Sequence, residues 1–94
     1  MRIDIDVFRT AVLKLLDHTE KVKGKTVDIP DDLYWFIPKE SLNDPTTKPA
    51  NLTLGSLTDD WTEVSAIAVG RKDPFGYGLV WAASLLRALG DRTY

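Results

Sequence analysis

The sequence predicts an α+β domain that is predominantly α, with three helices, the third of them central, a small β-hairpin, and a single domain over residues 1–94. Three observations lead to this prediction. Residues 5–22 carry apolar side chains at helical spacing, residues 77–89 are apolar except at Ser84 and Arg87, and residues 26–37 are rich in aromatic and β-branched side chains. A helix that is apolar nearly all the way round needs cover from its neighbours, so we expect the third helix at the centre.

The first helix is predicted over residues 5–22. Asp4 stands where an N-cap is expected, and Gly24 stands where helices commonly end. Between these two residues an apolar stripe recurs at helical spacing, and we expect it to face the core. The members of this stripe are Phe8, Val12, Leu15, Leu16 and Thr19.

The β-hairpin is predicted from about Thr26 to Ile37. Val27 and Ile29 alternate with polar residues, residues 30–32 (PDD) are typical of a turn, and residues 33–37 favour a strand. Residues 38–49 contain three prolines and are expected to form a loop, after which residues 52–54 are a candidate third strand. A two-stranded ribbon is marginally stable alone, so it is expected to pack against the helices.

The second helix is predicted to begin at Ser56 or Thr58, since either is a good cap, and to end at Gly70. Its apolar stripe includes Trp61, which is therefore expected in the core, as is Trp81 in the third helix.

The third helix is predicted to start at Pro74, because proline is favoured at the first helical position and Asp73 before it is a capping residue. It is expected to end at Gly90. The link of about four residues before it predicts that the second and third helices form an antiparallel pair. Ser84, Arg87 and Asp91 are expected to trace the narrow stripe that faces water.

Composition excludes several classes of protein. The chain is 44% hydrophobic and 28% charged, which is the ordinary globular range. It has no cysteine, which removes disulfides, thiol catalysis and thiolate metal sites. A formal net charge of −2 gives no reason to expect a nucleic-acid partner. The sequence also predicts no signal peptide and no membrane-spanning helix.

A group of acidic and aromatic residues in the middle of the chain is the candidate interaction surface. Strand alternation does not bury three consecutive aromatics unless both faces are covered, so at least one is expected to be exposed or to contact a partner. The residues of this candidate surface are Asp31, Asp32, Tyr34, Trp35 and Phe36. An alternative interpretation is a small carboxylate-dependent enzyme or ligand binder that uses Asp28, Asp31 and Asp32 with Tyr34.

Other charged residues have simpler interpretations. His18 is the only histidine and lies on the polar side of the first helix, so it is expected to be solvated. Asp59, Asp60 and Glu63 crowd the first turns of the second helix, where the helix dipole favours negative charge without a metal ion. Their spacing differs from that of a calcium loop. We expect no catalytic, cofactor-binding or metal-ligating residues, and no cofactor.

Two helices joined by a short turn also invite comparison with helix-turn-helix proteins. The second helix of that motif presents polar residues to the bases, whereas here it is the most apolar segment of the chain. DNA recognition is therefore not expected.

Three segments, LYWFIP (33–38), LTLGSLTDDW (52–61) and YGLVWAASLLRALG (77–90), together resemble a pattern found in small uncharacterised bacterial single-domain proteins. This resemblance covers about two-thirds of the chain. It implies a bacterial cytoplasmic protein that stands alone as one domain, and it brings no substrate or catalytic residue.

These observations favour a small domain that is a non-catalytic protein–protein interaction module and not an enzyme. An inhibitor, an immunity-type protein and a self-associating protein are all compatible with the sequence. We expect a protein partner or a second copy, with no nucleic acid and no membrane.

Overall fold

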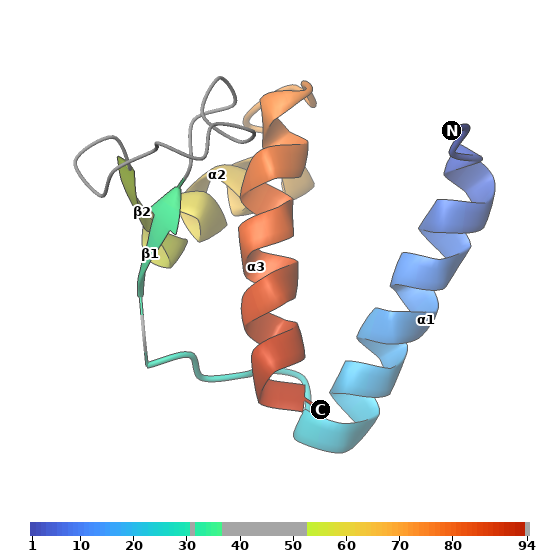
Figure 1. Ribbon diagram of the computed structural model, residues 1–94, viewed down its shortest axis with the longest axis horizontal. Coiled ribbons are helices and arrows are strands. Elements are labelled where there is room, and N and C mark those ends of the chain that lie inside the picture. Colours follow the sequence, from blue (N-terminus) through green and yellow to red (C-terminus); the bar gives the residue numbers. More distant parts are fainter. Residues whose placement is uncertain (31, 37–52, 94) are drawn as a thin grey trace. The chain divides into compact units, whose positions relative to one another are not determined.

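The computed structural model describes residues 1–30, 32–36 and 53–93 (Figure 1). In chain order its elements are helix α1 (Ile5–Lys23), strands β1 (Leu33–Phe36) and β2 (Thr53–Ser56), and helices α2 (Leu57–Ala68) and α3 (Tyr77–Thr93). The described residues thus form three helices and one antiparallel two-stranded hairpin, and the predicted α+β, predominantly α class is confirmed.

The chain divides into two compact units. One comprises Met1–Ile29 with Ala88–Tyr94, and the other comprises Pro30–Arg87. The hairpin, α2 and most of α3 therefore belong to the same unit. That residues 1–94 form a single domain stays a prediction.

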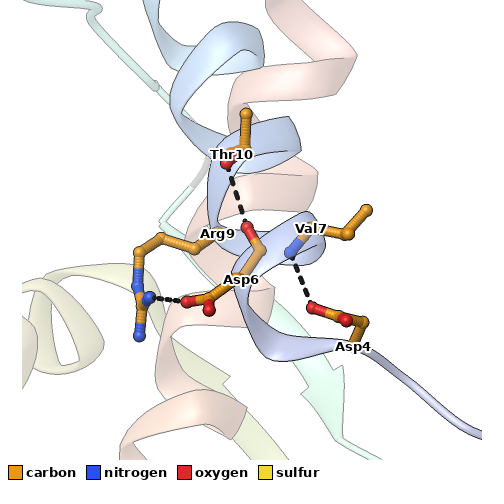
Figure 2. Close-up of polar contacts among 5 residues, drawn as sticks. All are labelled: Asp4, Asp6, Val7, Arg9 and Thr10. Atoms are coloured by element: carbon orange, nitrogen blue, oxygen red, sulfur yellow. Dashed lines mark hydrogen bonds and ion pairs between the residues drawn. The ribbon is translucent and has the colours of Figure 1, made fainter.

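Helix α1 begins and ends where its caps predict. The Asp4 carboxylate accepts a hydrogen bond from the backbone N–H of Val7 at 3.0 Å, which satisfies a free donor of the first turn (Figure 2). At the other end Gly24 has a φ of 93°, a left-handed conformation that glycine adopts without strain, and its N–H donates to the Glu20 carbonyl.

The hairpin differs from the one that the sequence predicts. Residues 26–30 form no strand, and β1 pairs instead with β2 in the register Leu33↔Ser56, Tyr34↔Gly55. The candidate third strand is thus the actual partner, shifted to Thr53–Ser56. This strand suits β1 as a partner because the Tyr34 ring fills the space above Gly55, which has no side chain. An added Cβ at residue 55 would lie 2.6 Å from Tyr34 Cε2. The predicted loop at residues 38–49 lies outside the described residues.

Ser56 is the N-cap of α2, which settles the choice between the two predicted caps. Its hydroxyl accepts from the Asp59 N–H at 3.3 Å. At the C-terminus Gly70 has a φ of 81°, its N–H donates to the Ile67 carbonyl, and the next N–H donates to Ala66 at 2.9 Å. These two bonds form a Schellman motif, so Gly70 ends the helix as predicted.

Helix α3 starts three residues after the predicted position and continues past Gly90 to Thr93. In its first turn, the N–H groups of Gly78 and Leu79 donate to the carbonyls of Phe75 and Gly76, three residues earlier in each case, so the helix opens with a tight 3₁₀-type turn. Glycines at 76 and 78 each disfavour an α-helical turn by about 1 kcal/mol relative to alanine. Gly78 lies within α3 in either case, so the cost that opposes the Asp73–Pro74 start is that of Gly76.

The apolar surroundings expected for α3 are not found. None of its described residues is buried, and Leu79 and Leu86 are exposed. Trp81 is only partly exposed, but Trp61, which was also expected in the core, keeps 62% of its surface accessible. Trp61 is exposed because α2 is turned about its axis relative to the orientation that its apolar stripe predicts. Asp60, which is 6% exposed, occupies the inward position expected for Trp61.

Candidate interaction surface

Asp32 connects the start of β1 to the start of α2. Its backbone carbonyl accepts from the Leu57 N–H at 2.7 Å, and its Oδ1 accepts from the backbone N–H and the hydroxyl of Thr58, at 2.6 and 2.7 Å. Its Oδ2 accepts from the Ser56 hydroxyl at 2.9 Å. Ser56 therefore donates to Asp32 while its hydroxyl oxygen caps α2. Both carboxylate oxygens of Asp32 accept hydrogen bonds from residues at the N-terminus of α2.

These hydrogen bonds lower the pKa of Asp32 below its ordinary value of 3.8, chiefly through the Thr58 hydroxyl, then the Thr58 N–H and the Ser56 hydroxyl. A lowered folded-state pKa contributes stability that is complete above pH 3.8 and is lost as the pH falls through the folded-state value.

We therefore expect Asp32→Asn to lower the melting temperature at pH 7 and to have a progressively smaller effect below pH 3.8, as the carboxylate of the unfolded chain and then that of the folded chain becomes protonated. Thermal unfolding followed by circular dichroism at a series of pH values measures this difference. Asp28→Asn is the matched control, because Asp28 is exposed and belongs to the same acidic segment. An equal effect of Asp32→Asn at pH 7 and pH 3 would contradict the assignment.

Asp60 joins three elements of the Pro30–Arg87 unit. The Tyr34 hydroxyl of β1 donates to Asp60 Oδ2, and Ser84 Oγ of α3 lies 2.5 Å from the same oxygen. Ser84 Oγ is also 2.7 Å from the Trp81 carbonyl, so its single proton has two possible acceptors. Burial, and next the bond to Asp60, raise the pKa of Tyr34 above 10.0, which keeps this phenol protonated as a donor.

Contacts between α2 and α3 run in opposite chain order, as predicted for an antiparallel pair. Asp60 near the start of α2 meets Ser84, and Ile67 near its end lies against Gly78, where an added Cβ would be 3.1 Å from Ile67 Cδ1. Ser84 was expected to face water, and this expectation is wrong. Its place in an otherwise apolar segment was the one sequence signal that pointed to a buried polar partner.

An aromatic group with a cation lies at the link between α2 and α3. The Phe75 and Tyr77 rings both meet the Trp81 ring edge-on, with centroids 5.3 and 5.4 Å apart. The Lys72 ammonium lies over Trp81, 4.9 Å from its centroid, and pairs with the Glu63 carboxylate. Lys72 therefore already occupies the face of Trp81 that a cationic ligand would require.

The residues of the candidate surface have different positions. Tyr34 turns toward Asp60, Asp32 holds the start of α2, and Trp35 and Phe36 complete β1. Asp31 lies outside the described residues. The Asp32 carboxylate and the Tyr34 hydroxyl are thus directed to different partners, and Asp28 is exposed.

The three carboxylates at the start of α2 also have different surroundings and do not converge on one site. Asp59 is exposed, Asp60 binds two hydroxyls, and Glu63 pairs with Lys72. Within residues 1–30, 32–36 and 53–93 no group of three or more His, Cys, Asp or Glu side chains has a geometry that could hold a metal ion.

Helix α1 carries an exposed apolar stripe. No residue of this 19-residue helix is buried. One face, which we call the α1 seam, carries side chains at alternating spacings of three and four, of which Val12 and Thr19 are partly exposed and the other four are exposed. The α1 seam comprises Ile5, Phe8, Val12, Leu15, Thr19 and Val22. The sequence assigns most of this stripe to the core, but within the unit Met1–Ile29 with Ala88–Tyr94 none of its side chains is buried.

In the described part of the chain, no helix combines the length and the apolar character required to cross a membrane.

The chain matches no protein-family model, and neither a curated protein nor a solved structure shows significant similarity to it. The resemblance to small bacterial single-domain proteins stays a prediction.

Proposed function

We propose that the protein is a non-catalytic protein–protein interaction module that acts in the cytoplasm and docks through the α1 seam. The observation that carries the proposal is the exposure of this seam along a helix of 19 residues with no buried side chain. Contiguous exposed apolar surfaces on small proteins typically mark sites of association. The proposed partner is a protein, because the apolar face of a second protein removes such a stripe from water.

The use of the polar side chains supports the same proposal. The carboxylates that an enzyme would need, Asp32 and Asp60, accept hydrogen bonds from helix starts and hydroxyls of the chain itself. These bonds explain both residues through stability alone. The carboxylate-dependent enzyme required Asp28, Asp31 and Asp32 to converge with Tyr34. Asp31 lies outside the described residues, and the other three have no comparable support.

A comparison of two matched variants in the native cell extract tests the proposal. Leu15 lies in the α1 seam and is 63% exposed, whereas Leu13 lies on another face of α1 and is 55% exposed. We expect Leu15→Lys bait to lose a partner at least about 10-fold in quantitative mass spectrometry, because a charge in an apolar interface is costly. Leu13→Lys bait is expected to retain that partner. Untagged copies of the same chain that are captured from the extract also count as a partner.

Equal capture by wild type, Leu15→Lys and Leu13→Lys would refute docking through the α1 seam. A further bait with Trp35→Ala and Phe36→Ala tests the predicted surface of Asp31, Asp32, Tyr34, Trp35 and Phe36. If this bait alone loses partners, the surface lies on the hairpin and not on α1.

A further inference from the structure

The spacing of the α1 seam is that of a coiled coil. Its six residues fall at consecutive intervals of 3, 4, 3, 4 and 3, which places Ile5, Val12 and Thr19 at the first core position of each heptad. Phe8, Leu15 and Val22 take the second core position, so the seam fills both positions of nearly three heptads without a charged residue.

We infer that the occupant of the α1 seam is a second copy of α1, aligned in parallel and in register. This inference rests on the proposed function and names its partner. Ile5 and Val12 at the first core position, with Leu15 at the second, match the pattern that favours two-stranded parallel coils, whereas Phe8, Thr19 and Val22 lie outside that pattern.

The residues that flank the seam agree with this alignment. Each heptad has two residues that flank its core: one just before the first core position and one just after the second. In a parallel pair, the first of these residues on one helix faces the second of them on the partner helix, within the same heptad. Asp4, the N-cap residue just before the helix, then lies toward Arg9 of the second copy, which joins opposite charges, and Ala11 faces Leu16, which joins apolar surfaces. The third pair, His18 with Lys23, adds no pair of opposite charges. An antiparallel pair would place Arg9 near Leu16 and so bury apolar surface against a charge.

Arg9 can exchange its partner within the chain for Asp4 of the second copy at a small cost in stability. In the single chain it pairs with Asp6 three residues earlier, and both side chains are exposed (Figure 2). Exposed ion pairs contribute little to stability. The Asp4 carboxylate uses Oδ1 to cap the helix, and its position before the first turn brings it to the N-terminal end of the seam.

The first measurement is the mass of the purified protein by light scattering over a concentration series. We expect wild type and Leu13→Lys to form dimers, and Leu15→Lys to weaken dimerisation at least about 100-fold, the size of effect that loss of one core leucine produces. A wild-type protein that stays monomeric, or equal dimerisation of the two variants, would overturn the inference.

The second measurement fixes the direction and does not depend on the stability of a lysine variant. Because the chain has no cysteine, Val22→Cys introduces a single thiol. In a parallel dimer Val22 faces its own copy, so mild oxidation is expected to give a covalent dimer, whereas Leu13→Cys should stay monomeric under the same oxidant. If Val22→Cys links only to Ile5→Cys in a mixture, the helices are antiparallel and the inference is wrong.

These results separate the inference from the proposed function. A monomeric purified protein that still captures another protein through Leu15 in the extract would overturn self-association alone. A monomer without such capture would overturn both.

Discussion

Replacement of Asp60 by alanine is expected to lower the free energy of unfolding by roughly 3 kcal/mol, the largest effect of any single substitution among the described residues. The side chain is 6% exposed and accepts from the hydroxyls of Tyr34 and Ser84. Its loss leaves the Tyr34 hydroxyl without its acceptor and Ser84 with only the Trp81 carbonyl, and it removes the carboxylate that β1, α2 and α3 share. Urea unfolding followed by tryptophan fluorescence, at one protein concentration, measures the change.

The neighbouring carboxylate supplies the control. Asp59 is exposed in the same first turns of α2, so Asp59→Ala loses only a dipole interaction worth up to about 1 kcal/mol. If the two alanine variants unfold at the same urea concentration, Asp60 does not join the three elements in the way described.

Gly55→Ala is expected to destabilise the protein by about 2 kcal/mol, although alanine is normally the better residue in regular structure. An added Cβ would lie 2.6 Å from Tyr34 Cε2 and 2.8 Å from the Tyr34 hydroxyl oxygen. The ring must therefore move, and it loses its bond to the Asp60 carboxylate. The same urea titration measures the loss.

A double-mutant cycle tests the mechanism of this loss. In a Tyr34→Ala background the space above residue 55 is open, and Gly55→Ala should then be neutral or stabilising by up to about 1 kcal/mol. An undiminished cost in that background would show that Gly55 is required for its backbone and not for the ring above it. Gly76→Ala is a glycine control, because an added Cβ there meets nothing within 4 Å.

The ends of the helices were predictable because their signals are local. Asp4 and Gly24 bound α1, and Gly70 ends α2, through contacts with residues no more than five positions away. The predicted start of α3 was wrong for a local reason too. The Asp73–Pro74 start requires Gly76 within the helix, at a cost of about 1 kcal/mol relative to alanine, and neither signal alone shows which of the two prevails.

The hairpin and the polar link were not predictable, because both depend on contacts between distant segments. Val27 and Leu54 both lie in plausible strands, and the choice of partner rests on how the Tyr34 ring fits over Gly55. Likewise Asp60 looks like one of several acids at a helix start. Only Tyr34 and Ser84, 26 and 24 residues away, make it the inward residue in place of Trp61.

The α1 seam shows a different limit of sequence reasoning. Its apolar periodicity was clear, but periodicity alone does not say whether the covering surface comes from the same chain or from another one. The exposure of Leu15 in the structure is what turns the stripe from a core face into a candidate interface.

No apolar side chain of the described residues is buried, and this has a thermodynamic consequence. The heat-capacity increment of unfolding grows with the apolar area newly hydrated, so the isolated chain should show a small increment and a shallow, broad calorimetric transition. Association through α1 would withdraw that area from water, and the transition should sharpen as concentration rises.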